Sequence, residues 1–586
     1  MGWIHDTNRK IAVSPVGRWF KLEGSGHPKE RKGSFFFTEI RAGIACFFAM
    51  AYIIAVNASI VADSGGTCVC EGGADDPVCD NNEAYSLCLQ TLRRDAVTAT
   101  AAISALSTFC MGLFANMPVG VAPGMGLNAY FTYTVVGYHG TGPVSFQTAL
   151  TAIFIEGFIF FALAILGLRQ WLARAIPASI KTATGVGIGL FLTLIGLTYS
   201  EGLGVIVGAV STPVELAGCS PGNRLEDGTC PDSDKMRYPG MWIGIFCGGI
   251  LTVLLMLYRV KAAIIAGILL VSVISWPRGT PVSYFPYDAV GDSNFDFFRR
   301  VVDFHQIGTT LNVLRFDPAE YTGQFGLALI TFLYVDILDC TGTLYGMARF
   351  ANLIDPVTQD FEGSSVAYMV DSLCISVGAV LGVPPVTAFV ESGAGISEGG
   401  KTGLTAVVAG ICFFISVFFA PIFASIPPYA TGSVLILVGS MMASAVVDIN
   451  WKYLGDAVPA FLTIALMPFS YSIADGLIAG VMSYIIINMT VYLIKVASGG
   501  RIVPPNYEEK EYWTWRIPGG VLPGWVVRLF RGKKDFWRED TPRVQETQSQ
   551  EEASKETTAP LEKVVTNENV SDGPKSTDAG ITRKED

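Results

Sequence analysis

The feature that most constrains this 586-residue chain is the recurrence of long apolar segments that carry hardly any charge. A segment of about 20 apolar residues can cross a bilayer as a helix. Because lipid offers no hydrogen-bond partners, such segments must pair their own backbone groups, which α-helices do. Charged residues make up only 16% of the chain and the mean hydropathy is +0.44. We therefore expect an all-α polytopic membrane protein.

The apolar pattern predicts about fourteen segments, some of them too short to span alone. They are residues 35–61, 96–114, 119–136, 148–168, 180–198, 241–258, 262–276, 326–345, 366–381, 386–396, 404–419, 431–447, 458–471 and 476–496.

Basic residues predict the orientation of the chain, since Lys and Arg near helix ends favour the cytoplasm. Residues 1–34, 169–181, 259–261 and 495–534 are rich in them. An even number of spans with both termini in the cytoplasm fits these positions. The charged N-terminus shows no cleavable signal pattern. No basic stripe lies within a folded part, so we expect no nucleic-acid partner.

Six cysteines fall in two polar loops that this orientation places outside the cell. The six are Cys68, Cys70, Cys79, Cys88, Cys219 and Cys230. An even number in each oxidising loop predicts disulfides, although the pairing within the first loop stays open. Zinc is the rival interpretation, but histidines are absent nearby and the spacing is poor.

Two pairs of fragments look alike across the two halves. Residues 119–123 resemble 381–385, and residues 176–185 resemble 426–432. Because an odd number of segments separates each pair, the halves would have opposite orientations, as in the inverted repeats of secondary transporters. Chance similarity between Gly- and Pro-rich membrane sequences is the alternative.

The third segment of each half is interrupted by Gly and Pro, at residues 122–130 and 384–395. Paired segments of this kind point to a binding site near the middle of the membrane, where two half-helices meet. Asn128 and Glu391 lie in these two segments. An amide offers both a donor and an acceptor, and a carboxylate accepts.

Residues Thr331–Gly346 read as a membrane span that carries Asp336 and Asp339 on one helical face. An ionised carboxylate in hydrocarbon costs roughly 2.5–3.5 kcal/mol or more, so it needs a polar cavity, a partner or a proton. No Lys or Arg lies in these segments. The set therefore suits a neutral ligand with N–H donors, a cation or a proton, and not an inorganic anion.

Structural roles compete with functional ones for several of these residues. Asp339 either caps a backbone break beside Gly342, or takes part in function. Asn128 could simply link two helices. Asp371 and Asp475, near helix ends, are expected to be caps or gate contacts. The few histidines lie in polar stretches, and neither a metal set nor a nucleophile with a base is present, so we expect no enzyme, metal or cofactor.

These motifs together resemble the AzgA-like purine permeases, which are related to the nucleobase–ascorbate transporters. The resemblance covers residues 35–496 in order. It is carried by residues 38–43, 122–130, 334–344 and 387–405.

The resemblance implies fourteen segments in two inverted sevens, forming a core domain and a gate domain, with short strands and half-helices in segments three and ten. It implies proton symport of hypoxanthine, adenine and guanine into the cell across the plasma membrane, by an elevator movement. By motif, Asn128, Asp336 and Glu391 match substrate-site positions, and Asp339 matches a second acidic position. Homodimers occur in related transporters.

The carboxylates that could carry the proton are Asp336, Asp339 and Glu391, and Asp336 is preferred because its neighbours are the most apolar. Transport of another nucleobase, such as uracil or xanthine, and cation coupling in the same fold are the alternatives.

The expected organisation follows from these boundaries. Residues 1–34 form a cytoplasmic arm, 35–276 the first repeat, 277–320 an extracellular connection, 321–496 the second repeat and 497–586 a cytoplasmic tail. The tail is rich in Glu, Lys, Thr and Ser and is expected to be largely disordered.

Overall fold

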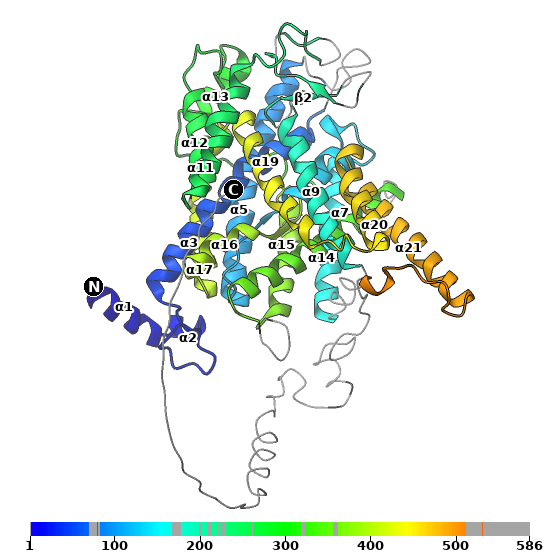
Figure 1. Cartoon of the computed structure of the whole chain (residues 1–586). Coiled ribbons are helices and arrows are strands. Elements are labelled where there is room, and N and C mark those ends of the chain that lie inside the picture. Colours follow the sequence, from blue (N-terminus) through cyan, green and yellow to red (C-terminus); the bar gives the residue numbers. More distant parts are fainter. Residues whose placement is uncertain are drawn as a thin grey trace, which may run out of the picture. The chain divides into compact units, whose positions relative to one another are not determined.

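A computed structural model describes most of the chain (Figure 1). The described residues are 2–69, 79, 82–166, 177–198, 202–208, 212, 214–220, 223–225, 229–260, 262–317, 323–354, 361–510, 530 and 532. The chain divides into a unit of residues 1–523 and a unit of residues 524–586, and only Phe530 and Gly532 of the second unit are described. Most of the predicted disordered tail therefore lies outside the described residues.

Apolar helices dominate the first unit. Within the described ranges, eight helices are long and apolar enough to cross a membrane: Phe36–Asp63, Glu83–Ala115, Phe146–Leu166, Ala178–Leu197, Pro239–Leu257, Gly323–Phe350, Pro428–Asp448 and Ile473–Ala497. Four shorter apolar helices are Ala263–Ser275, Ser364–Val380, Gly403–Ser416 and Leu454–Ser470. The predicted helical, polytopic class is confirmed, while the count of fourteen spans stays a prediction.

The first span consists of two helices, α3 (Phe36–Met50) and α4 (Ile53–Asp63), which meet at a turn over Ala51–Tyr52. The next helix, α5 (Glu83–Ala115), begins well before the predicted start at residue 96. A hydropathy pattern misses the first turns because they are polar. These turns are nevertheless helical, and their polar side chains bind other segments. Asp95, for example, accepts hydrogen bonds from the backbone of Gly308 and Thr309 at 2.9 and 2.6 Å.

Both interrupted segments contain a strand followed by short helical turns, as predicted. In the first, β1 (Val121–Pro123) leads into α6 (Met125–Ala129) and the π-helix η1 (Tyr130–Val135). In the second, β4 (Val386–Ala388) leads into the 3₁₀ turn η6 (Val390–Ser392) and α16 (Gly393–Ser397). The two strands pair antiparallel, with Ala122 opposite Thr387.

The helices that surround this strand pair form what we call the strand-pair group. Besides α3–α5 it contains α7 (Phe146–Leu166), α14 (Gly323–Phe350), α15 (Ser364–Val380) and α17 (Gly403–Ser416).

A second set of helices packs together beside it, and we call it the α9 group. It contains α9 (Ala178–Leu197), α19 (Pro428–Ala443), α20 (Leu454–Ser470) and α21 (Ile473–Ala497) (Figure 1). Close backbone contact holds α9 against α19, since a Cβ on Gly189 would lie 2.6 Å from the Gly439 carbonyl oxygen. Glycines at such crossings let membrane helices approach closely.

Shorter elements complete the fold. They are α1 (Gly2–Val13), α2 (Pro15–Trp19), η2 (Tyr138–Gly140), β2 (Ile206–Val207), β3 (Glu215–Leu216), α10 (Pro239–Ile243), η4 (Gly244–Ile250), α11 (Leu251–Leu257), α12 (Ala263–Ser275), α13 (Ala289–Phe298), α18 (Ala420–Ala424), η7 (Ser444–Asp448) and η8 (Tyr507–Glu509).

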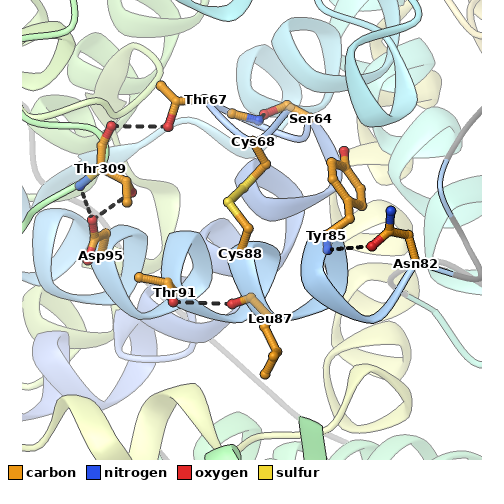
Figure 2. The surroundings of a disulfide bond; sticks show 11 residues. Ser64, Thr67, Cys68, Asn82, Tyr85, Leu87, Cys88, Thr91, Asp95 and Thr309 are labelled. Carbon is orange, nitrogen blue, oxygen red and sulfur yellow. Dashed lines mark hydrogen bonds between the residues drawn. A yellow bond between two sulfur atoms is a disulfide. The ribbon is translucent and has the colours of Figure 1, made fainter. Parts of the chain in front are cut away.

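Disulfides join several of the candidate cysteines at one end of the helices. Cys68 pairs with Cys88 and thereby ties the end of the first span to the start of α5 (Figure 2). Cys219 pairs with Cys230 beside the β2–β3 hairpin. Cys79 is also disulfide-bonded, and Cys70 lies outside the described residues.

The connection predicted at residues 277–320 is ordered against this same end. It contains α13, and Thr309 donates to Asp95 at 2.7 Å while its carbonyl accepts from Thr67 at 3.3 Å (Figure 2). We call this end of the helices the disulfide face.

The N-terminal arm is folded at the opposite end. Trp19 donates to the Leu113 carbonyl at 2.9 Å, and Phe20 and Leu22 are buried with Leu404. The Glu362 carboxylate pairs with Lys21 at 2.8 Å and with Lys29 at 3.1 Å. The arm is therefore docked on the helices rather than extended.

We predict that Glu362→Gln loosens the arm. Burial opposes ionisation of Glu362, but its ion pairs with Lys21 and Lys29 outweigh burial and lower its pKa below the ordinary value of 4.5. Their stabilisation is thus complete above the ordinary glutamate pKa and is lost as the pH falls through the lowered value. At pH 7 the amides of residues 15–22 should exchange hydrogen about 1.5- to 5-fold faster in the variant, since such ion pairs contribute roughly 0.2–1 kcal/mol.

The control is Glu508→Gln at an exposed position. Equal exchange of residues 15–22 in wild type and Glu362→Gln would contradict the proposed docking role.

Candidate functional site

The pairing of β1 with β4 brings the two interrupted segments into one place. Beyond the strands, the Phe389 amide donates to the Gly120 carbonyl at 3.0 Å and the Gly124 amide donates to the Pro385 carbonyl at 2.9 Å. Strand edges in the membrane interior need such partners, because lipid supplies none. Segments that are more than 250 residues apart in the sequence thus start their helical turns from a shared two-stranded sheet.

Hydroxyl groups of α5 satisfy the outer edge of β1. The Val121 carbonyl accepts from Ser107 at 2.8 Å and from Thr108 at 2.9 Å, and the Val121 amide donates to Thr108 at 3.0 Å. All three residues are buried. The sheet is therefore held by side chains, which keeps a short pair of strands in register.

Asn128 lies on α6, directly after β1, and is fully buried. Its Nδ2 donates to Asn57 Oδ1 at 2.5 Å, and Asn57 in turn donates to Thr100 at 2.6 Å. The Asn128 amide oxygen has no hydrogen-bond partner in the described part of the chain. A buried acceptor without a partner is costly, so this oxygen is suited to a ligand that brings an N–H donor.

Glu391 lies in η6, directly after β4. The Tyr52 hydroxyl donates to Glu391 Oε1 at 2.7 Å. Tyr52 occupies the turn between α3 and α4, and this turn lets a buried tyrosine in the middle of the first span reach the second interrupted segment.

The two aspartates of α14 face different surroundings. Asp339 interacts electrostatically with Glu391, and its helix α14 contacts β4. Asp336 is fully buried, its carboxyl accepts no hydrogen bond from the described residues, and its electrostatic partners are Asp371, Glu156 and Asp339. The structure therefore brings Asn128 and Glu391 to the strand pair, with Asp339 in electrostatic contact with Glu391. Asp336 belongs to a buried carboxyl cluster with Asp371 and Glu156.

One of the alternatives for Asp339 is wrong. A cap on a backbone break beside Gly342 would need an interrupted helix, but α14 is continuous from Gly323 to Phe350. The helix has no proline inside, and Gly342 faces open space, so nothing interrupts its hydrogen bonds. Asp339 is therefore available to the strand pair rather than used to cap a helix end.

One buried carboxyl group, that of Glu156, was missed from the sequence, and another, that of Asp371, was given a different role. Glu156 of α7 and Asp371 of α15 are both fully buried, and they interact electrostatically with each other. Asp371 also lies near the Cys340 thiol and Asp339. It was expected to cap a helix or contact a gate, but it points into the packed helices. Glu156 showed the same signal as Asp336, a lone carboxylate in an apolar span.

Aromatic and aliphatic side chains surround these polar groups. The rings of Tyr130 and Phe332 pack edge to face with centroids 5.1 Å apart. On the side of the α9 group, a Cβ on Gly126 would lie 2.6 Å from Ile188. The site thus lies in the seam between the two helix groups. A few polar groups in an apolar setting suit a small, planar, largely neutral ligand.

Among the described residues, no group of three or more His, Cys, Asp or Glu side chains could hold a metal ion.

Comparison with known proteins identifies the family. The family model described as a permease family, Xan_ur_permease, matches residues 82–479, a range that includes both interrupted segments. The chain belongs to the xanthine/uracil permease family. It is therefore a membrane transporter and not an enzyme.

Relatives from three organisms match this permease over most of its length. A protein of Aspergillus versicolor named Efflux pump notK' is 65% identical over 539 residues, covering 92% of this chain and 93% of the relative. A protein of Schizosaccharomyces pombe that carries the name of a xanthine/uracil permease is 59% identical, covering 92% and 86%. The guanine/hypoxanthine permease PbuG of Bacillus subtilis is 36% identical, covering 77% and 90%.

We predict that Asn57→Ala weakens substrate binding without unfolding the permease. Asn57 orients Asn128, so its loss leaves a buried amide without a partner, at a cost of about 1–3 kcal/mol. The KM for the transported base should rise roughly 5- to 150-fold. Uptake kinetics and surface abundance measure this.

Ser104→Ala is the matched control, because Ser104 is buried on α5 and its hydroxyl has no hydrogen-bond partner in the described ranges. A wild-type KM in Asn57→Ala would refute the orienting role of Asn57.

Proposed function

We propose that this permease imports purine nucleobases, namely hypoxanthine, adenine and guanine, together with protons. The observation that carries the proposal is the pair formed by the unpartnered Asn128 oxygen and the Glu391 carboxylate at the two ends of one strand pair. Both groups accept hydrogen bonds, and a purine ring carries N–H donors at its edge. The similarity to the guanine/hypoxanthine permease PbuG supports a purine substrate.

Specificity in this proposal comes from buried acceptors. A site that hydrogen-bonds its ligand strongly rejects analogues that lack the donor, because its own polar groups are left unpaired. Asn128 and Glu391 would bind the base directly, with Asp339 nearby. Asp336 interacts electrostatically with Asp339 and would act on the site through its charge.

Proton coupling is proposed from the row of carboxyl groups that leads away from the strand pair. Electrostatic interactions link Glu391 to Asp339, Asp339 to Asp371, and Asp336 to both Asp371 and Glu156. Several ionised carboxylates cannot coexist in a buried, low-dielectric environment, so the row must hold protons. A proton taken up here would neutralise charge beside the substrate and so link proton transport to substrate transport.

The orientation and the movement are also part of the proposal. Disulfides form in oxidising compartments, so the disulfide face would be extracellular and the termini cytoplasmic at the plasma membrane. The strand-pair group would be the core and the α9 group the gate, within a 7+7 inverted repeat. Transport would then be an elevator movement along the seam, as a monomer or within a homodimer.

Uptake measurements test the substrate and the coupling ion. In cells without their own purine uptake, the permease should take up radiolabelled hypoxanthine, and adenine and guanine should compete more strongly than uracil or xanthine. Uptake should increase as the external pH falls and should not depend on sodium.

Sodium dependence without pH dependence would favour the cation-coupled alternative. Stronger competition by uracil or xanthine would favour another nucleobase. Accelerated loss of preloaded hypoxanthine, without uptake, would favour export, which the name of the Aspergillus relative suggests.

A substitution of Asp336 tests its proposed role in proton coupling. Asp336→Asn removes a titrating group from the carboxyl row and should reduce pH-driven hypoxanthine accumulation in proteoliposomes at least about tenfold, while exchange of internal for external hypoxanthine persists. Asp296→Asn, at a position with a 74% exposed side chain, is the control. Unchanged accumulation in Asp336→Asn would exclude Asp336 as the coupling residue.

A further inference from the structure

A cavity opens at the disulfide face, away from the strand pair. It has a volume of about 510 Å³ and is lined by Tyr133, Tyr138 and Tyr471, by the β2 strand, and by Thr198 and Arg224. Its size falls in the range of small-molecule sites. No part of the central site, neither Asn128 nor Glu391, contributes to its lining.

Both helix groups contribute to the cavity wall. Tyr133 lies on η1, which continues α6, so it is five residues after Asn128 on one helical segment. Thr198 and β2 follow α9. The cavity therefore lies over the same seam as the central site, on the continuation of the segment that carries Asn128.

Tyr471 lines the cavity and contacts both helix groups. It ends α20 in the left-handed conformation, with φ of 55°, which a tyrosine adopts only when its surroundings impose it. Its carbonyl accepts from Thr134 at 2.8 Å. Its ring packs edge to face on Tyr133, at 5.8 Å between centroids, and on Phe191 of α9, at 5.2 Å.

The ring of Tyr133 is in turn held by a hydrogen bond from its hydroxyl to Asp63 at 2.8 Å. Tyr138 stacks on His139 with centroids 4.0 Å apart, so its ring plane is also set. The cavity thus presents oriented aromatic faces next to a planar guanidinium. Aromatic rings stack favourably on nucleobases, and they do so for every base because each has a flat π-face.

We propose that this cavity is an outer binding station where a planar nucleobase stacks on Tyr138 and Tyr471 before it reaches the central site. The inference rests on the proposed function for the chemical class of the ligand. Tyr471 forms the floor of the station. The tyrosine rings bind the flat face of the base, and the acceptors at the strand pair select it afterwards by its edge.

Protection of an introduced cysteine tests the station. Gly208 lines the cavity and is exposed, whereas Leu216 on the neighbouring strand is 56% exposed and does not line it. Gly208→Cys and Leu216→Cys would be made in the full chain, placed in lipid nanodiscs, and labelled with a maleimide with and without millimolar adenine. Adenine should slow the labelling of Gly208→Cys at least about fivefold and leave Leu216→Cys unchanged.

Two further variants separate the station from the central site. Protection of Gly208→Cys should persist with Asn128→Ala, which disables the central site, and should be lost with Tyr138→Ala. No protection, or protection abolished by Asn128→Ala, would overturn the station. Hypoxanthine uptake by the wild type tests the proposed function separately, so the two can fail independently.

Discussion

The antiparallel pairing of β1 with β4 is the interaction on which the rest of the structure depends. Each strand is only three residues long, and neither could exist alone in a membrane, because its backbone groups would lack partners. The pairing satisfies them, and Ser107 and Thr108 of α5 satisfy the remaining edge. As a result Asn128 and Glu391, from opposite halves of the chain, lie at one site in the seam between two helix groups.

Burial of polar groups explains how this site can be selective. Tyr52 and Asn57 of the first span hold Glu391 and Asn128 in place, so the acceptors are oriented before any ligand arrives. Behind them the carboxyl groups of Asp336, Asp371 and Glu156 are buried among α7, α14 and α15. Ionisable groups inside membrane spans are rare and mark functional sites, so these helices are candidates for a functional role and not only for a structural one.

The aromatic residues at the disulfide face and the polar residues at the strand pair would contact different parts of a ligand. The tyrosines near the disulfide face offer ring planes, whereas the strand pair offers acceptors. Stacking is tolerant and hydrogen bonding is selective, so a ligand that meets the tyrosines first would be concentrated before it is discriminated. Tyr471 packs on Tyr133 of one helix group and on Phe191 of the other, so the tyrosine surface depends on how the two groups contact each other.

The sequence by itself determined the membrane class, the two interrupted segments, the cysteine loops and the polar residues Asn128, Asp336, Asp339 and Glu391, because each depends on local composition. Only the tertiary structure decided which of these meet. Asp339 interacts with Glu391 of the second interrupted segment, whereas Asp336 interacts with Asp371 and Glu156, because different segments pack against the two positions of α14. The contributions of Tyr52, Asn57 and Tyr471 depend on contacts between distant segments, and no local pattern encodes such contacts.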